Sequence, residues 1–480
     1  MAKQSRHLEL PLAPRPAGVP LHRWLYGELR QAIVMGRLKP GARLPSTRLL
    51  AIQQGVARAT VVAVFEQLRF EGYFQSRTGS GTVVSAELPD RFVLAGPRGN
   101  PVRATNAKGD LPRQFPAPTR SRAFQVCEPP TDIFPVKLWA QLMTRRFKLG
   151  GYGLLADGDP RGYAPLRRAI AAHLGAARSV NCEPERIVIV SGTQQALDLV
   201  TRLLVRKGDA VWMENPGYPG AARAFRQAGA RLVPVAVDDA GMNVVTALRR
   251  EPAPRLVYVT PAHQFPLGGV LALSRRLELL QAAKRQGFHV FEDDYDGEFR
   301  YDVRPLGSLQ GEDDGNPVIY AGSFNKLLFP SLRLGFVVLP EDLVERFLAL
   351  RENLDRYPPT VEQAVLTDFI TEGAFARHIR TSRAACLERR DALLAAARSL
   401  LRGRLDLQPC PAGFHGVGWL AGGRRDTDVV RQAAKHDVKV SALSEFYLEK
   451  PRHDGLLLGY AATKPSVIKT GIERLARALA

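Results

Sequence analysis

Hydrophobic positions near helical spacing predict three helices in the first 85 residues. Leu21, Leu25, Leu29 and Ile33 mark one apolar face over residues 20–41, and that pattern stops at glycines and a proline. Residues 44–54 predict a short helix capped by Ser46, and residues 57–72 predict a second one after a tight turn. Residues 73–85 then alternate around a glycine-rich turn, as in a hairpin. The pattern indicates a winged helix-turn-helix over residues 1–85.

Beyond residue 126, helical patterns such as APLRRAIAAHL alternate with short apolar runs typical of buried strands. The runs are RIVIVSG, DAVWMEN, RLVPVAV, RLVYVTP, FHVFEDD and VIYAGSF. This alternation predicts an α/β domain over residues 126–480, with a mostly parallel sheet, helices on its faces, and binding groups at the carboxyl ends of the strands. Residues 86–125 are rich in Pro, Gly, Arg and Asn with little periodicity, and are predicted to be a linker.

Composition adds the class of protein and its compartment. Of the 480 residues, 45% are hydrophobic and 24% charged, as in globular proteins, and no apolar run approaches the roughly 20 residues that cross a bilayer. The segment MAKQSRHLELPLAPRP lacks the apolar core of a secretory signal. The four cysteines are scattered without metal-ligand spacing, which favours a reducing cytoplasm and argues against a disulfide framework; no metal site is expected.

The net charge of +20 is concentrated near the first residues. Residues 1–85 hold 12 Lys and Arg against 4 Asp and Glu, and residues 86–125 hold 7 against 3. A basic surplus at one end favours a partner with a phosphate backbone, such as double-stranded DNA, and a solvated basic surface is the alternative.

Several predicted strands end in polar or special residues. SGTQ at 191–194 precedes a helix whose N-terminal amides suit a phosphate, although such residues are also ordinary caps. Tyr218 lies in a Pro/Gly turn, where it could cover a flat ligand or simply pack. His263 and Gln264 follow another strand, and a lone histidine is more often structural.

The segment FEDDYDGEFRY brings five polar residues to the end of one strand. Three aspartates and a glutamate there are costly unless some meet a cation or a metal. Lys326 follows 33 residues after Asp293, with Ser323 before it and Arg333 after it. A reactive lysine, a carboxylate for a ring nitrogen and a phosphate seat together match pyridoxal 5′-phosphate, and the alternative is a surface lysine beside a proline turn.

The motifs together resemble the MocR-type group of the GntR family of transcription regulators. The front module is similar to the GntR winged helix-turn-helix. GDPRGYAPLRRAIAAHL, SGTQQALDLV, ENPGYPG, TPAHQFPLGG, EDDYDGEFRY and GSFNKLLFPSLRLGF appear in the order of a fold-type-I aminotransferase. The resemblance implies a small winged helix-turn-helix joined to a large, pyridoxal-phosphate-binding domain of aminotransferase-like fold.

The resemblance also implies residue roles. Lys326 would bond to the cofactor aldehyde as the catalytic lysine, Asp293 would pair with the ring nitrogen, Tyr295 would face the ring hydroxyl and Tyr218 would stack on the ring. The other implied cofactor residues are His263, Gln264, Gly192, Thr193, Gln194, Ser323 and Arg333. The implied DNA contacts are Arg43, Ser46, Arg48, Arg58, Thr60, Arg77, Gly79, Ser80, Gly81 and Thr82.

Some positions depart from the family pattern. Asn325 stands where serine is common, Leu267 replaces a small hydroxylated residue, and Asp157 replaces a tyrosine that reaches the neighbouring subunit's phosphate. Ala57 and Ala59 remove a helix cap and a polar contact in the DNA module. Near the last strand, GLLLGYAATKP has leucines where amino-acid aminotransferases place the arginine that clamps a carboxylate.

The expected function is therefore a cytoplasmic, homodimeric transcription regulator. Its aminotransferase-like domain is expected to sense pyridoxal phosphate or an amine or amino-acid adduct of it, without steady transamination. An active aminotransferase with an appended DNA-binding module is one alternative. A structural nucleic-acid-binding protein with a cofactor-free domain is another.

Overall fold

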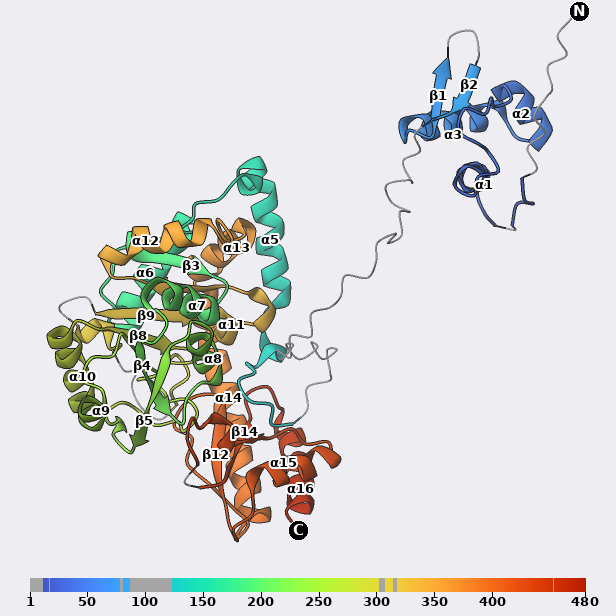
Figure 1. Cartoon of the computed structure of the whole chain (residues 1–480). Helices are drawn as coiled ribbons and strands as arrows, with labels where there is room; N and C mark the ends of the chain where they lie inside the picture. Colours follow the sequence, from blue (N-terminus) through green and yellow to red (C-terminus); the bar gives the residue numbers. More distant parts are fainter. Residues whose placement is uncertain are drawn as a thin grey trace, which may run out of the picture. The chain divides into compact units, whose positions relative to one another are not determined.

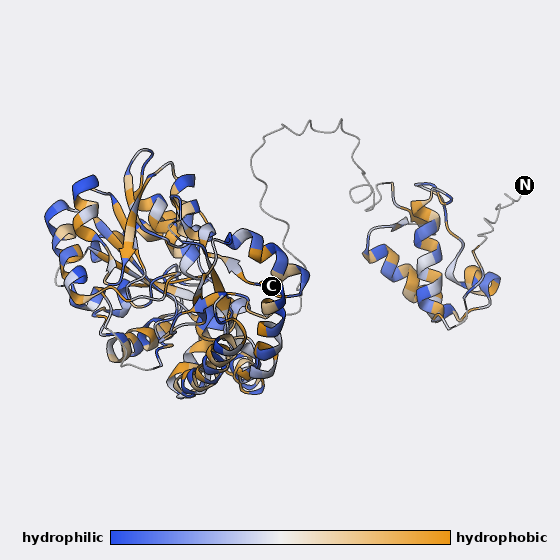
Figure 2. Ribbon diagram, turned by 90° about the horizontal axis from the view of Figure 1, so that it is seen from below, coloured by the Kyte–Doolittle hydropathy of each residue, from blue (hydrophilic) through white to orange (hydrophobic). Residues whose placement is uncertain are grey.

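A computed structural model describes residues 12–16, 18–77, 81–86, 123–301, 307–313, 317–451 and 453–480 of the chain. The chain divides into two compact units, Met1–Gln114 and Phe115–Ala480 (Figure 1). In both units the helices carry hydrophobic residues beside hydrophilic ones, as expected for helices with one buried face (Figure 2). Among the described residues, no helix is both long and apolar enough to cross a membrane.

The first unit contains three helices and a hairpin. These are α1 (Leu21–Val34), α2 (Thr47–Gln54), α3 (Arg58–Phe70), β1 (Phe74–Arg77) and β2 (Gly81–Val84). Leu25, Leu29 and Ile33 are buried in a common core, as predicted, whereas Leu21 is 39% exposed because the apolar face begins one turn later. The two strands pair antiparallel, with Phe74 opposite Val84, and form the predicted wing.

Helix boundaries in this unit follow the capping residues. The Ser46 hydroxyl accepts a hydrogen bond of 3.2 Å from the Leu49 amide at the start of α2. Gly55 ends α2 in the left-handed conformation, with φ +63°, which glycine adopts without strain. Ala57 precedes α3 and supplies no side-chain cap. The helix-turn-helix predicted from the sequence is therefore present, with one helix capped and the other not.

The second unit is built on an eight-stranded sheet with the order β3-β10-β9-β8-β7-β4-β5-β6. Strands β4, β5, β7, β8 and β9 run parallel to one another, whereas β10 is antiparallel to both β3 and β9, and β6 is antiparallel to β5. The bounds are β3 (Ile187–Val190), β4 (Ala210–Asn215), β5 (Arg231–Asp238), β6 (Gly241–Met242), β7 (Leu256–Val259), β8 (His289–Asp294), β9 (Val318–Ser323) and β10 (Gly335–Val338). All six predicted strands are present.

Helices cover both faces of this sheet. Along β4, Val211 and Met213 belong to one hydrophobic cluster and Trp212 to another, so the strand is buried on both sides. The helices of this unit outside its C-terminal part are α5 (Val136–Gly150), α6 (Ala164–Arg178), α7 (Thr193–Leu204), α8 (Pro219–Gln227), α9 (Val244–Arg250), α10 (Leu273–Gln286), α11 (Phe324–Leu327), α12 (Glu341–Glu352) and α13 (Thr360–Thr371).

The C-terminal part forms a second sheet that the sequence patterns did not anticipate. It has the order β11-β12-β14-β13 and is antiparallel. Its elements are α14 (Ala374–Leu400), β11 (Leu405–Leu407), β12 (His415–Leu420), α15 (Asp426–Lys435), β13 (Ser441–Ala442), β14 (Gly455–Gly459) and α16 (Pro465–Ala478). Along β14, Leu456 and Leu458 face the main core, and Leu457 faces a smaller apolar cluster.

The predicted linker, residues 86–125, lies mostly outside the described residues. Its last residues belong to the second unit. Phe124 is fully buried and forms an isolated bridge with Gly459, and Lys439 donates its amide hydrogen to the Ala123 carbonyl. These contacts reach Gly459 at the end of β14, so the large unit begins before residue 126.

Candidate cofactor site

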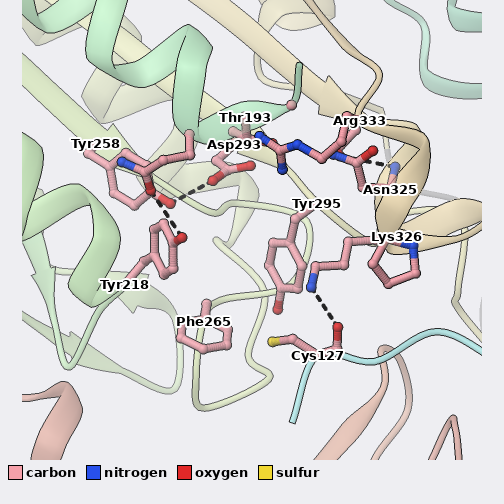
Figure 3. Close-up of a pocket in the computed structure, with 14 residues that line it drawn as sticks. Cys127, Thr193, Tyr218, Tyr258, Phe265, Asp293, Tyr295, Asn325, Lys326 and Arg333 are labelled. Atoms are coloured by element: carbon pink, nitrogen blue, oxygen red, sulfur yellow. Dashed lines mark hydrogen bonds between the residues drawn. The ribbon is translucent and has the colours of Figure 1, made fainter. Parts of the chain in front are cut away.

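The carboxyl ends of neighbouring strands surround one cavity of about 380 Å³ (Figure 3). Strand β3 leads to the start of α7, strand β8 ends near Asp293, and strand β9 leads to Lys326 on α11. Because β3, β10, β9 and β8 are adjacent in the sheet, residues far apart in the sequence meet here. The lining residues are Cys127, Gly192, Thr193, Gln194, Tyr218, Tyr258, Phe265, Asp293, Tyr295, Ser323, Asn325, Lys326, Pro330 and Arg333.

Lys326 points into this cavity from the short helix α11. The Ser323 hydroxyl caps that helix by accepting a hydrogen bond of 3.2 Å from the Asn325 amide. The Lys326 ammonium donates a hydrogen bond of 2.5 Å to the carbonyl oxygen of Cys127. Cys127 has φ +63°, a left-handed conformation that favours glycine. The lysine is thus held within the cavity by the segment through which the chain enters the large unit.

Asp293 offers an acceptor with no partner. Its Oδ2 accepts a hydrogen bond of 2.7 Å from the Tyr258 hydroxyl, whereas its buried Oδ1 has no hydrogen-bond partner among the described residues. Burial raises the pKa of Asp293 to about 7, and the negative charges of Asp294 and Asp296 act in the same direction. A buried carboxylate with a free oxygen suits a cationic N–H donor, which would satisfy the oxygen and stabilise the charge.

The neighbouring acids are separated and individually paired. Glu292 accepts hydrogen bonds of 2.8 and 2.9 Å from two backbone amides, and burial raises its pKa to about 7. Asp294 pairs with Arg178 at 2.7 Å, and Asp296 pairs with His263 at 2.9 Å. Among the described residues, no group of His, Cys, Asp and Glu is arranged to hold a metal ion. Alternation along β8 leaves only Asp293 of these carboxylates in the cavity lining.

Two tyrosines flank the space between Asp293 and Lys326. The Tyr295 hydroxyl lies 2.9 Å from Nδ1 of His263, and the Tyr218 hydroxyl donates a hydrogen bond of 3.1 Å to Oε1 of Gln194. Burial raises the pKa of Tyr218 to about 12 and that of Tyr295 well above its ordinary value, so both hydroxyls keep their protons. Each can donate or accept a hydrogen bond at the edge of a flat ligand.

The end of the cavity near α7 is shaped for an anion. Gly192 has φ +135°, and a Cβ added there would lie 2.6 Å from Nδ2 of Asn325. The amides at the start of α7 carry the positive end of the helix dipole, and Arg333 brings a positive charge to the same end (Figure 3). Asn325 itself joins the elements, since it donates to the Ser191 carbonyl at 3.0 Å and accepts from the Leu334 amide at 2.9 Å.

Two predicted residues lie behind the cavity and do not line it. His263 bridges Asp296 and Tyr295, so it orients groups next to the site. Gln264 uses its amide nitrogen to donate to the carbonyls of Pro216 and Phe265. Asp157 also lies outside the lining. It is exposed and accepts a hydrogen bond of 2.6 Å from the Tyr357 hydroxyl.

Five lining residues were not predicted from the sequence as site residues: Cys127, Tyr258, Phe265, Asn325 and Pro330. Of these, Asn325 appeared only as a departure from the family pattern. Tyr258 lies inside the run RLVYVTP, where it resembles any buried strand residue, and only its pairing with Asp293 reveals its position. Cys127 carried no signal because a left-handed backbone angle cannot be read from a cysteine. Phe265 lies between the predicted His263–Gln264 pair and Leu267. The motif around it was therefore identified, but Phe265 itself was not predicted to line the cavity.

The predicted DNA-contacting residues lie in the first unit, on or beside α2, α3 and the wing. Arg43, Ser46, Arg48 and Arg58 are exposed, and Thr60 is half-buried on the first turn of α3. Gly81 and Thr82 lie on β2. Gly79, Ser80 and the side chain of Arg77 lie outside the described residues. The exposed arginines near the starts of α2 and α3 provide a basic surface suited to a phosphate backbone.

Comparison with known proteins identifies both units. Residues 21–84 match the family model of bacterial regulatory proteins of the gntR family, and residues 133–475 match that of aminotransferase class I and II. The chain is 40% identical over 466 residues to the probable rhizopine catabolism regulatory protein MocR of Rhizobium meliloti, which covers 96% of this chain and 94% of that protein. The chain belongs to the MocR-type family of transcription regulators.

A second related regulator and a similar solved structure agree with this assignment to the MocR-type family. It is 32% identical to the transcriptional regulator TauR of Rhodobacter capsulatus, over 98% of both chains. Its large unit is similar to the α-aminoadipate aminotransferase LysN of Thermus thermophilus, with a TM-score of 0.69 and 29% identity over 74% of this chain and 91% of that one. That structure holds N-(5′-phosphopyridoxyl)-L-leucine. The MocR-type regulator thus joins a DNA-binding GntR module to a fold-type-I aminotransferase domain.

Proposed function

We propose that this regulator binds pyridoxal 5′-phosphate covalently through Lys326 and senses the cofactor, or an adduct of it with an amine or amino acid. One observation carries the proposal: the same cavity contains the Lys326 amine, an unpartnered buried carboxylate oxygen on Asp293, and an anion seat at Gly192. When bound, pyridoxal phosphate supplies an aldehyde that condenses reversibly with primary amines.

The residues of the cavity would each hold one part of the cofactor. Asp293 Oδ1 would accept the ring N–H, while Tyr258 keeps the other oxygen in place. Tyr295, positioned by His263, would donate to the ring oxygen, and Tyr218 would cover the ring. The phosphate would be held by residues that supply hydrogen-bond donors or, as glycine, allow the backbone to come close. These are Gly192, Thr193, Gln194, Ser323 and Arg333.

The first unit would bind an operator in double-stranded DNA. Arg43, Ser46, Arg48, Arg58 and Thr60 would make phosphate and base contacts, together with the wing residues Arg77, Gly79, Ser80, Gly81 and Thr82. Two copies of the chain would bind together, because helix-turn-helix proteins commonly read paired half-sites. The regulator would act in the cytoplasm. Exchange of Lys326 for an incoming amine would change the charge and contacts of the cavity, and so bias the DNA-binding arrangement.

Covalent capture at Lys326 tests the cofactor part directly. The full-length protein is saturated with pyridoxal phosphate, reduced with borohydride, digested and mapped by mass spectrometry. The expected result is a pyridoxyl mass on Lys326, absent in Lys326→Ala and retained in the surface control Lys148→Ala. An unmodified Lys326 would overturn the proposal.

The sensing part needs a DNA measurement. An operator fragment is selected by binding to the full-length protein, and its affinity is then measured with and without pyridoxal phosphate. The proposal expects the cofactor to change the affinity of wild type and Lys148→Ala, and to leave that of Lys326→Ala unchanged. Equal affinities with and without cofactor in all three proteins would contradict a sensor role.

A further inference from the structure

The end of the cavity opposite the anion seat is apolar. Phe265 and Cys127 lie at that end, and Lys326 and Tyr295 lie between it and Asp293 (Figure 3). The Phe265 ring packs edge-on against Phe446, with centroids 5.4 Å apart. Phe446 belongs to an apolar cluster that also contains Val126, Leu267, Val417, Leu443 and Leu457. Phe265 therefore joins the cavity to this apolar cluster through its contact with Phe446.

Leu457 is one of the buried members of this apolar cluster. It is fully buried on β14, and its strand neighbours Leu456 and Leu458 face the opposite side, toward the main core. Strand geometry thus directs one leucine of the LLL run toward the cluster that contains Val126 and Phe446. Val126 of the same cluster is adjacent in the chain to Cys127, whose carbonyl meets Lys326.

Positive charge is confined to the rest of the cavity. Among the described lining residues, only Lys326 and Arg333 are cationic. Arg333 lies at the anion seat, and Lys326 is the group that an incoming amine displaces. His415, whose ring lies 5.6 Å from that of Phe265, is buried and has a pKa lowered to about 4 by that burial, so it is neutral at pH 7. His263 is paired with Asp296.

Cys127 narrows the same end of the cavity. Its φ of +63° is one that glycine adopts without strain, yet this residue carries a side chain that lines the cavity. A carboxylate next to the reacting amine would meet this thiol and the Phe265 ring, not a guanidinium. Burying a carboxylate against such groups without a cation or several donors is strongly unfavourable.

We infer that the ligand which exchanges with Lys326 is a primary amine whose amine-bearing carbon carries no carboxylate. The inference rests on the proposed function, since it requires the cofactor at Lys326. In the exchange, the nitrogen of the incoming amine forms a bond to the cofactor carbon that is attached to Lys326 Nζ. The bond between that carbon and Nζ breaks, and Lys326 is released as a free amine. One amine enters and one leaves, with no oxidation or reduction.

The test compares α-amino acids with the amines that remain after loss of their carboxylate. The matched probes are L-leucine with 3-methylbutylamine, and L-phenylalanine with 2-phenylethylamine. Each is titrated into the full-length, pyridoxal-phosphate-loaded protein, at known concentrations of unprotonated amine. The readouts are the shift of the cofactor absorbance band and, after borohydride reduction, the loss of pyridoxyl mass from Lys326. The amines are expected to exchange at concentrations at least about 100-fold lower than their amino acids.

Variants at Leu457 test the cause of this preference. Leu457→Arg supplies a cation and is expected to reduce or reverse the preference for amines over their parent amino acids. The neutral Leu457→Met is expected to keep that preference. The wild-type comparison stands without either variant, so misfolding of L457R leaves the inference falsifiable.

The outcomes separate the inference from the proposed function. The inference alone is overturned by either of two results, provided that Lys326 carries the pyridoxyl mass in the sample without probe. In one, the amino acids exchange as readily as their amines; in the other, no probe lowers the pyridoxyl mass on Lys326. Lys326 that is never labelled before any probe is added overturns the proposed function, and the inference with it.

Discussion

Lys326 Nζ and the carbonyl oxygen of Cys127, 199 positions apart in the chain, are joined by a hydrogen bond of 2.5 Å. The contact links Lys326 to the first described residues of the large unit, where Phe124 is fully buried beside Gly459. A covalent bond between Lys326 and a cofactor would change the hydrogen bond that Nζ donates to the Cys127 carbonyl. The first described segment of the large unit therefore contacts the group whose chemistry is proposed to change.

Replacing Cys127 by valine should destabilise the large unit. A β-branched side chain strongly disfavours the left-handed conformation at φ +63°, so the free energy of unfolding should fall by about 1–2 kcal/mol. Chemical denaturation of the full-length protein measures this. Cys127→Gly adopts the same angle without strain and should be at least as stable as wild type. Equal loss in both variants would mean that the thiol, not the backbone angle, matters.

Asp293→Asn should stabilise the cofactor-free protein while weakening cofactor binding. The folded pKa of about 7 lies above the ordinary 3.8, so the folded state keeps a proton that the unfolded state releases. This group therefore favours folding at low pH, and its contribution is lost as pH rises from about 4 to about 7. Removing the charge should raise the free energy of unfolding at pH 7.5, by at most about 4 kcal/mol, and flatten its pH dependence across that window.

Glu214→Gln provides the matched control for Asp293→Asn. Burial also raises the pKa of Glu214 to about 7, but this residue accepts hydrogen bonds from Thr260 and does not line the cavity. Both variants should gain stability in denaturation at pH 7.5. Only Asp293→Asn should reduce the affinity for pyridoxal phosphate, by about 100-fold or more, measured by absorbance titration. Similar cofactor affinities in the two variants would remove the assigned role of Asp293.

Gly192→Ala should damage the anion seat. The backbone angle of +135° strains any other residue, and the new methyl group would lie 2.6 Å from Asn325 Nδ2. A loss of about 1–3 kcal/mol in stability and weaker binding of pyridoxal phosphate are expected. Gly153→Ala is the control, because an added Cβ there meets no atom within 4 Å. Cofactor titration that gave the same affinity for both variants would contradict the prediction.

Capping predicts opposite effects in two neighbouring helices. Ser46→Ala removes the bond to the Leu49 amide and should destabilise α2 by about 1 kcal/mol, whereas Ala57→Ser adds a missing cap and should stabilise α3 by a similar amount. Hydrogen exchange of the two helices in the full-length protein reports each effect locally. Faster exchange of α3 in Ala57→Ser would show that this boundary does not accept a serine cap.

Arg58→Ala should weaken operator binding by about tenfold or more and reduce the salt dependence by about one ion, while leaving the cofactor spectrum unchanged. Arg58 is exposed at the first position of α3, whereas Arg69 is exposed in its last turn. Arg69→Ala should therefore change DNA affinity much less. Binding titrations between about 50 and 200 mM salt compare the two variants. A flat salt response would argue against the basic front module as the contact surface.

The sequence by itself determined the local elements and their order. Helical spacing and capping residues marked the helix-turn-helix, and short apolar runs marked six strands of the main sheet, because these signals depend on neighbours along the chain. The motifs also identified nine of the residues that line the cavity, from Gly192 to Arg333. Each motif follows a strand, and strand order brings such ends together.

Tertiary structure alone decided which groups of those motifs reach the cavity. Alternation along β8 placed Asp293 in the lining and turned Asp294 toward Arg178, whereas Asp296, beyond the end of the strand, pairs with His263. Contacts between residues distant in sequence, such as Tyr258 with Asp293 and Cys127 with Lys326, have no local pattern that could reveal them. The antiparallel small sheet, and with it the apolar cluster that packs against Phe265, likewise depends on pairings that only the folded chain brings into register.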